Sequence, residues 1–539
     1  MESRITFHEL IPKSGKMDNN RPNLILITTD QQRWDAVACA GNSVIRTPNI
    51  DRLAAEGTLF TQAVTPCPIC IPARISILTG RMSGAYGVIE NYQTRTQPET
   101  VLPRALAEAG YHTRAIGCMN FVPSTETYGF QEMTLCEETG WVRSPSIHPD
   151  GRIRFDDYDR YLHERGLWGW DKPIQIGYNE IKPTINPLPI EHHVTTWCGD
   201  RAVEYLEEVD RDFFLFLSFT KPHPPYDAPQ GTEDWYSPDS IPSPEKEEGE
   251  LETKHPDLET YRKRHEFHLY SDEAARTSRS YYYANITLID QQIGRVLDTL
   301  ESRGLLENTM ILFTSDHGDL MGDHGLWFKS LGYEGSVRVP MILRGVDPST
   351  QGRRSDQQAG LIDILPTFLT AGGCKLPQNL PGRDLADVAR DPASDRPFMA
   401  IEVECMNGPL QILRSKKWKY IHYESGDFEE LYDLEKDPCE FTNLAIDPDF
   451  HETARSLRSD LAAYLSIHST PALSLANGDL RSRPYTPISS KPGPMPFSQM
   501  PWMLRAPPAT LDDPDQIGWW WAMKEGSDWS CMLDDDLRG

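Results

Sequence analysis

The chain has 539 residues, a length that allows one large domain with a smaller one, or two to three domains of ordinary size. Apolar residues make up 39% and charged residues 25% of it, which is typical of a globular protein and excludes a disordered one. The net charge of -27 argues against nucleic-acid binding, which needs a basic surface, although a local cation cluster or a metal ion can still attract an anionic substrate.

The first 385 residues alternate apolar runs with amphipathic segments. The runs resemble strands buried on both faces, and the segments show helical spacing. In chain order we expect a strand at residues 24–27, helices at 48–60 and 102–109, strands at 115–117 and 213–219, a helix at 284–303 and a strand at 309–315. Strands that alternate with helices predict an α/β fold with a largely parallel sheet.

One polar stretch interrupts this alternation. Residues 227–280 are rich in Glu and Pro, which predicts an excursion over the surface. The charge run at residues 245–252 within it indicates a solvated face.

The pattern changes near residue 385. Residues 411–423 and 430–433 are predicted strands of a small antiparallel sheet, and a helix follows at about 450–466. We therefore expect four parts: an N-terminal extension, a catalytic domain, a C-terminal subdomain and a tail. They cover residues 1–21, 22–385, 386–468 and 469–539, respectively.

The tail holds ten of the 43 prolines and five of the 13 tryptophans. A flexible linker would not carry Trp519-Trp520-Trp521, so we expect the tail to pack on the body or on a neighbouring subunit. This favours a homo-oligomer, with dimer and tetramer equally open.

The sequence also predicts a cellular location. The first residues lack the apolar core of a signal peptide, and no window approaches 18 consecutive apolar residues. The ten cysteines are scattered through the chain, as is usual for reduced thiols. We expect a cytoplasmic protein that does not enter a membrane.

Polar residues follow three of the predicted strands. They are Asp30-Gln31, Lys221 with His223, and Asp316-His317. Ligands of open α/β sheets bind beyond the carboxyl ends of the strands, where these side chains would meet. Carboxylates, an amide oxygen and an imidazole suit a hard or borderline divalent cation, although Asp30 and Asp316 could instead only cap turns.

Cys70-Ile-Pro-Ala-Arg74 adds a candidate reactive group. Pro72 suits the first turn of a helix, so Cys70 would lie at a helix N-terminus, where an anion is favoured. Arg74, one turn further, could pair with an oxyanion. Alternatively, Cys70 is an inert buried thiol, or forms a redox pair with Cys67.

Cys-x-Pro-x-Arg at residues 70–74, followed by Leu-Thr-Gly-Arg at 78–81, resembles the signature of the sulfatase family. The resemblance extends from about residue 22 to about 445, and residues 430–443 look like part of the C-terminal subdomain of the family. It implies an alkaline-phosphatase-like fold, in which helices sandwich a large, mostly parallel sheet beside a smaller antiparallel one.

The resemblance also implies a cofactor set. Cys70 would be oxidised by a separate formylglycine-generating enzyme, a transient partner, to formylglycine, whose hydrate is a geminal diol. One oxygen of this residue would complete the shell of a single divalent ion, calcium or manganese. The other implied metal ligands are Asp30, Gln31, Asp316 and His317.

The remaining implied residues bind a small anionic ester. Arg74, His223 and Lys329 match the anion-binding residues of the family, and Asn91 matches an active-site Asn of one branch. The diol would attack sulfur or phosphorus, with His223 or Lys329 protonating the leaving oxygen and Asp316 as a candidate base. His324 lies near the metal motif in the sequence and is a candidate to contact the metal ligands without binding the ion itself.

The pattern departs from the family at residues 117–120. Many sulfatases have Gly-Lys-x-His there, whereas this chain has Gly-Cys-Met-Asn, so neutral side chains replace two cations at Cys118 and Asn120. The phosphonate monoester hydrolases are similar in lacking that pair and in having Asp-Gln as the first metal motif.

We therefore expect a sulfate ester hydrolase that is promiscuous toward phosphodiesters and phosphonate monoesters. Three alternatives stay open: a phosphonate monoester hydrolase or phosphodiesterase, a two-zinc phosphatase or mutase, and a catalytically silent binding protein.

Overall fold

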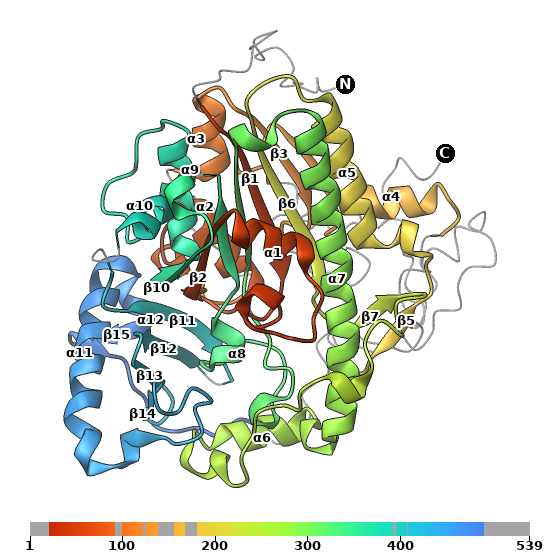
Figure 1. Cartoon of the computed structure of the whole chain (residues 1–539). Helices are drawn as coiled ribbons and strands as arrows, with labels where there is room; N and C mark the ends of the chain where they lie inside the picture. Colours follow the sequence, from red (N-terminus) through yellow and green to blue (C-terminus); the bar gives the residue numbers. More distant parts are fainter. Residues whose placement is uncertain are drawn as a thin grey trace, which may run out of the picture.

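The structure is a computed structural model (Figure 1). It describes residues 21–91, 100–121, 126–137, 156–167, 180–345, 347–391, 395–406 and 408–489. Within these ranges the largest element is an eight-stranded sheet with the order β10-β2-β9-β8-β1-β6-β3-β4. Its strands are β1 (Asn23–Asp30), β2 (Gly57–Val64), β3 (His112–Gly117), β4 (Glu132–Leu135), β6 (Phe213–Pro222), β8 (Thr309–Ser315), β9 (Met341–Arg344) and β10 (Arg353–Gly360). All pairings are parallel except those of β9, which confirms the predicted α/β fold.

Side chains alternate between the two faces of the sheet. Ile25 and Ile27 of β1 belong to one apolar core, and Leu24 and Leu26 belong to another. Because successive side chains of a strand point to opposite faces, a continuous apolar run needs a helical layer on each side.

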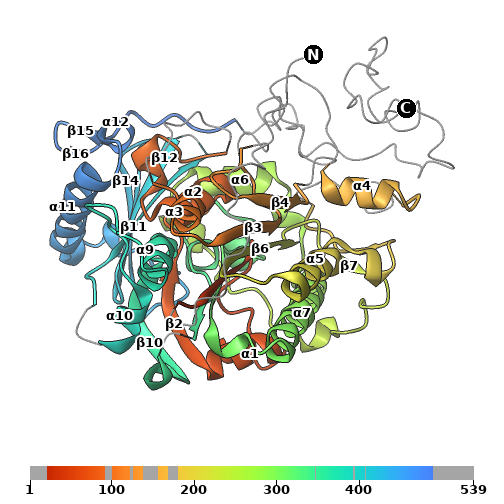
Figure 2. The same ribbon diagram turned by 90° about the horizontal axis from the view of Figure 1, so that it is seen from above.

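Figure 2 shows these two layers. The first contains α1 (Pro48–Ala55), α5 (Val194–Glu208) and α7 (Asp272–Ser302). The second contains α2 (Cys70–Thr79), α3 (Leu102–Glu108), α9 (Ile364–Ala371) and α10 (Leu385–Arg390). Shorter elements are α4 (Asp157–His163), β5 (Thr184–Asn186), β7 (Asp227–Pro229), α6 (Asp257–Arg264) and α8 (Glu334–Val337). Among the helices so described, none has the length and hydropathy that a membrane crossing requires.

A second sheet has the antiparallel order β11-β12-β13-β14. Its strands are β11 (Met399–Cys405), β12 (Gly408–Arg414), β13 (Trp418–Tyr423) and β14 (Phe428–Asp433), with α11 (His451–His468) packed on it. One face shares a core with Leu320, Leu331 and Tyr333 of the segment that follows β8. The small sheet therefore supports a segment that reaches the carboxyl end of the large one.

Three predicted boundaries are wrong. The helix expected at residues 48–60 ends at Ala55, because Gly57 begins β2, where a Cβ would lie 2.2 Å from the Leu343 carbonyl oxygen of the neighbouring strand. Residues 411–423 form parts of two strands joined by a turn, not one strand. The predicted excursion at 227–280 already contains the start of α7, which Ser271 caps through its Oγ.

The charge run at residues 245–252 is only partly a solvated face. Glu250 is buried and pairs with His324 and Lys254.

The tail up to residue 489 adds α12 (Pro471–Ser474), β15 (Leu475–Ala476) and β16 (Asp479–Leu480), and Ser474 donates to Glu402. The prediction for Trp519-Trp520-Trp521 lies outside the described residues, and the four-part division stays a prediction.

Asp290 of α7 links two helices of the first layer. The carboxylate is buried and accepts hydrogen bonds from the backbone amides of Asn49 (3.0 Å) and Ile50 (2.8 Å) in the first turn of α1. Asp290→Ala leaves these amides without their acceptor, so we expect a loss of about 2 kcal/mol of stability and a lower thermal midpoint. Asp298→Ala, at an exposed position of the same helix, is the control and should leave the midpoint unchanged; equal midpoints for both variants would contradict this capping role.

Candidate active site

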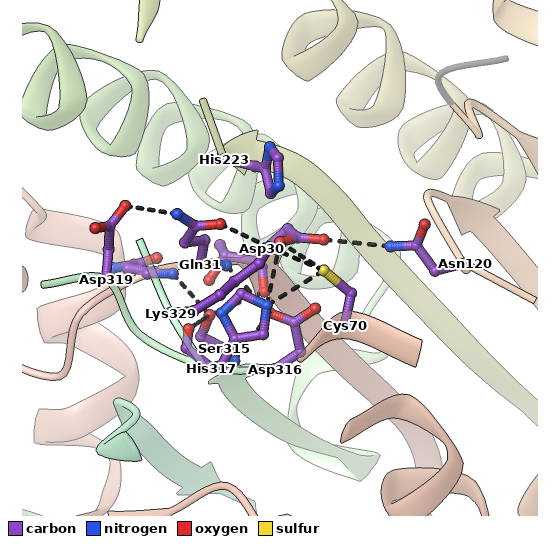
Figure 3. Close-up of polar contacts among 12 residues, drawn as sticks. Asp30, Gln31, Cys70, Asn120, His223, Ser315, Asp316, His317, Asp319 and Lys329 are labelled. Atoms are coloured by element: carbon purple, nitrogen blue, oxygen red, sulfur yellow. Dashed lines mark hydrogen bonds and ion pairs between the residues drawn. The ribbon is translucent and has the colours of Figure 1, made fainter. Parts of the chain in front are cut away.

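The parallel pairing of β1 with β8 and β6 brings three predicted strand ends together. Ligand atoms of Asp30, Cys70, Asp316 and His317 all lie within 4.8 Å of one another, and all four residues are buried. We call these four residues the metal cluster. Figure 3 shows Gln31, Lys329 and His223 beside it. The sequence reasoning therefore selected residues that the fold places in one site.

Cys70 is the first residue of α2. The preceding Ile69 is extended, and Pro72 occupies the first turn, so the Cys70 side chain projects from the helix start. Its Sγ lies 3.1 Å from Lys329 Nζ, 3.3 Å from His317 Nε2 and 3.7 Å from Asp30 Oδ1. Burial and the nearby Asp30 carboxylate raise the pKa of the thiol well above its usual value, so it stays protonated at neutral pH.

Arg74 lies behind the cluster. It is 1% exposed, and its Nε and Nη2 donate to Asp316 (3.1 Å) and Asp30 (3.2 Å). Its Nη1 donates to the Cys118 carbonyl oxygen and to Ser218 Oγ. Each guanidinium nitrogen therefore has a protein acceptor, so the structure places Arg74 as a partner of the two carboxylates.

Gln31 is held at its backbone and at both ends of its side chain. Its φ of 69° is unusual for a residue with a side chain, and its backbone N–H donates to Asp316 Oδ1 (3.1 Å). Its carbonyl oxygen accepts from the Tyr282 hydroxyl at 2.7 Å. Its amide Nε2 donates to Asp319 Oδ2 (2.6 Å), and its Oε1 accepts from Lys329 Nζ (2.7 Å).

Two histidines of the site are neutral. Burial and nearby Lys329 lower the pKa of His317 to about 3 and hold that of His223 well below its usual value. His317 Nδ1 lies 3.0 Å from the Gly318 carbonyl oxygen, to which it donates, so Nε2 presents a lone pair to the cluster. His223 Nδ1 likewise donates to Pro224, at 2.6 Å.

Lys329 is the cation closest to Cys70 Sγ. Burial alone lowers its pKa, but the nearby carboxylates of Asp30 and Asp316 raise it above the usual value, so the ammonium group is charged. Asn91 lies at the start of α2, where its Oδ1 accepts from the Ile71 backbone N–H at 3.1 Å. Lys221, in contrast, donates to Pro225 and Asp227 and holds the turn after β6.

The neutral segment after β3 also contacts the metal cluster. Asn120 has a φ of 51°, and its Nδ2 donates to Asp30 Oδ2 at 3.3 Å. The backbone amides of Met119 and Asn120 donate to Glu137 at 2.7 and 2.9 Å, and burial raises the pKa of that carboxyl group to about 7. Glu137 thus holds Asn120 in place.

Sequence reasoning missed two carboxylates and misplaced one histidine. Asp319 was visible as part of Asp316-His-Gly-Asp319, whereas Glu137 follows the short strand β4 and gave no signal. His324 turns away from the metal cluster, because its Nδ1 lies 2.5 Å from Glu250 Oε2 and its ring contacts Tyr333. No contact of His324 with a metal-cluster residue occurs in the described part of the chain.

The donor set fits a divalent cation. Two carboxylates, an imidazole lone pair and the Gln31 amide oxygen are ligands that hard and borderline ions accept. Burial and the neighbouring Asp316 raise the pKa of Asp30, so the nearby Lys329 and Arg74 do not fully offset these two effects on Asp30. A bound cation would supply the missing positive charge.

Known proteins show two kinds of similarity. Residues 22–374 match the family described as "Sulfatase", and residues 322–466 match "N-sulphoglucosamine sulphohydrolase, C-terminal". An arylsulfatase from Clostridium perfringens is 33% identical over 461 residues, which cover 82% of this chain and 94% of that protein. A choline-sulfatase from Rhizobium meliloti is 30% identical over 446 residues, covering 80% and 84%.

The fold has close counterparts among solved structures. A phosphonate monoester hydrolase from Agrobacterium radiobacter has a TM-score of 0.72 at 24% identity, with 86% of this chain and 100% of that chain covered. Similarity at this level of identity establishes the shared architecture.

Proposed function

The chain belongs to the sulfatase family, and on this premise we propose that it hydrolyses sulfate esters with a nucleophile made from Cys70. The observation that carries the proposal is the buried metal cluster, in which Cys70 begins a helix and faces Asp30, Asp316 and His317 within 4.8 Å. A separate formylglycine-generating enzyme would oxidise Cys70, and the hydrate of the resulting aldehyde would supply the attacking hydroxyl.

We assign one divalent ion, calcium or manganese, to the metal cluster. Asp30, Gln31, Asp316 and His317 would hold it, together with an oxygen of the modified residue 70. Such an ion supplies Lewis acidity: it lowers the pKa of a hydroxyl and polarises ester oxygens. Arg74 orients the two carboxylates from behind and offsets part of their charge.

Lys329, the cation that faces Cys70, would bind the ester anion. Lys329 is charged and lies 3.1 Å from Cys70 Sγ, so it is placed to stabilise negative charge on the transferred group and to donate a proton to the leaving oxygen. His223 is neutral, so it would first act as a hydrogen-bonding and positioning group. Asp316, in the same cluster as Cys70, is our candidate proton acceptor, and Asn91 fixes the start of α2.

A second candidate is a phosphonate monoester hydrolase or phosphodiesterase. The neutral residues Cys118 and Asn120 favour it, because the phosphonate monoester hydrolases are similar in lacking two cations there. A site without these cations also matches a doubly charged substrate poorly. Sulfate monoesters, phosphodiesters and phosphonate monoesters carry one negative charge, whereas a phosphate monoester carries nearly two at pH 7.

Matched 4-nitrophenyl esters test both candidates. We expect the sulfate, phosphodiester or phosphonate ester to exceed the phosphate monoester at least about tenfold in kcat/KM, since one uncompensated charge costs on the order of 1 kcal/mol or more. The largest value among the favoured esters decides the main activity. Asn120→Lys should reduce this difference in kcat/KM between the phosphate monoester and the singly charged esters. If the unmutated protein hydrolyses the phosphate monoester as fast as the sulfate ester, the argument from charge is refuted.

A further inference from the structure

We propose that Asp319 is a positioning residue that decides which end of the Gln31 amide faces the metal cluster. The inference rests on the proposed function, since it gives Gln31 Oε1 the role of a ligand. Asp319 is fully buried, and Figure 3 shows it on the side of Gln31 opposite the Cys70 sulfur. It is not itself a member of the metal cluster.

The backbone leaves Gln31 little freedom except a turn of its amide group. Asp316 and the Tyr282 hydroxyl hold the two peptide groups of a residue whose φ is 69°. A terminal amide can rotate by 180° with almost no change of shape, so sterics do not choose between oxygen and nitrogen. The choice must come from hydrogen-bond partners.

Asp319 and Lys329 contact the two ends of the Gln31 amide, and both favour the same orientation. The Asp319 carboxylate only accepts hydrogen bonds, so it selects the NH₂ end, at 2.6 Å. The Lys329 ammonium group only donates, so it selects the oxygen, at 2.7 Å. The lone pairs of Gln31 Oε1 therefore face the side on which Lys329 and Cys70 lie.

Asp319 is itself fixed by three other donors. Its Oδ1 accepts from the backbone amides of Met321 and Phe328, each at 2.9 Å, and its Oδ2 also accepts from the Tyr226 hydroxyl at 2.7 Å. Phe328 precedes Lys329 in the chain, so the same carboxylate supports the segment that carries the cation. A carboxylate with four donors has one stable orientation.

Asp319→Asn isolates the orienting role. The amide oxygen can keep both backbone hydrogen bonds, while the new NH₂ group points at Gln31 Nε2. Gln31 must then flip and present its own NH₂ to the metal cluster, or leave two donors facing each other. We expect the affinity for calcium and manganese to fall about 10- to 100-fold, as for other residues that orient metal ligands.

The measurement is a titration of each ion alone against a fluorescent chelator, with the full chain and without substrate. Tyr226→Phe removes another donor to the same oxygen but keeps the contact with Gln31, so its affinity should stay within about threefold of the unmutated protein. The pair Gln31→Glu with Asp319→Asn reverses the polarity of the contact and again points an oxygen at the cluster, so it should restore the affinity.

The outcomes separate orientation from simple loss of structure. Weak binding by Asp319→Asn with recovery in the double variant supports the proposal. It is overturned if Asp319→Asn binds both ions as tightly as the unmutated protein, if the double variant binds no better than Asp319→Asn, or if Tyr226→Phe loses as much affinity. An unmutated protein that binds neither ion would overturn the proposed function, and this inference with it.

Discussion

Cys70→Ala is expected to lower the hydrolysis of an aryl sulfate at least about 10³-fold, as the loss of a catalytic nucleophile does. The side chain is buried at the start of α2 and faces Asp30, Asp316 and His317, so the substitution removes the group from which the attacking hydroxyl would be made. Because burial and Asp30 keep the thiol protonated, the unmodified cysteine is a poor nucleophile. Activity should therefore follow the fraction of molecules in which residue 70 is oxidised to the aldehyde.

Cys67→Ala is the matched control. Cys67 is also buried in the same Cys-x-x-Cys segment, but its Sγ lies 3.6 Å from the Ile89 carbonyl oxygen, and it is not part of the metal cluster. This variant should keep both the activity and the modification. Mass spectrometry of the peptide spanning residues 53–74 should show a loss of about 18 Da on conversion of the thiol to an aldehyde.

Two results would contradict the proposal. Full activity of Cys70→Ala would show that residue 70 is not the nucleophile. An unmodified Cys70 in protein produced together with the formylglycine-generating enzyme would instead favour a catalytically silent binding protein.

The elements that could be predicted are those whose local pattern matches their final environment. Strand β8 has the predicted bounds, because a strand buried on both faces shows a continuous apolar run, here Met310 to Phe313. The boundary between α1 and β2 was predicted wrongly, because a short apolar run after a helix fits either a continued helix or a strand. Strand β9 was missed because its partners β8 and β2 are distant in the sequence.

The same distinction applies to the site. Asp30, Asp316 and His317 could be found because parallel strands end at one edge, which a pattern of strands already implies. The contact between Asp319 and Gln31 could not be predicted, although Asp319 stands in the same sequence motif as Asp316. It depends on the loop in which the Leu320 backbone N–H bonds to the Phe328 carbonyl oxygen. Contacts set by loop conformation leave no periodic signal in the sequence.

Arg74→Met is expected to destabilise the protein by about 3–5 kcal/mol in the absence of divalent ions, the usual cost of removing one partner of a buried ion pair. The guanidinium group is 1% exposed and bridges Asp30 and Asp316, so the variant leaves both carboxylates buried without their cation. A divalent ion bound at the metal cluster would restore positive charge at the same two groups. The loss in thermal midpoint should therefore be smaller with calcium or manganese than with a chelator.

The kinetic consequence separates two roles for this residue. If Arg74 acts by orienting Asp30 and Asp316, then Arg74→Met lowers kcat while KM changes little, because its nitrogens contact protein acceptors. Lys329→Met, which removes the cation facing Cys70 Sγ, should change both constants. Arg74→Lys should rescue little, since one ammonium group cannot bridge two carboxylates as the planar fork does. A raised KM with unchanged stability would instead assign Arg74 to the substrate anion.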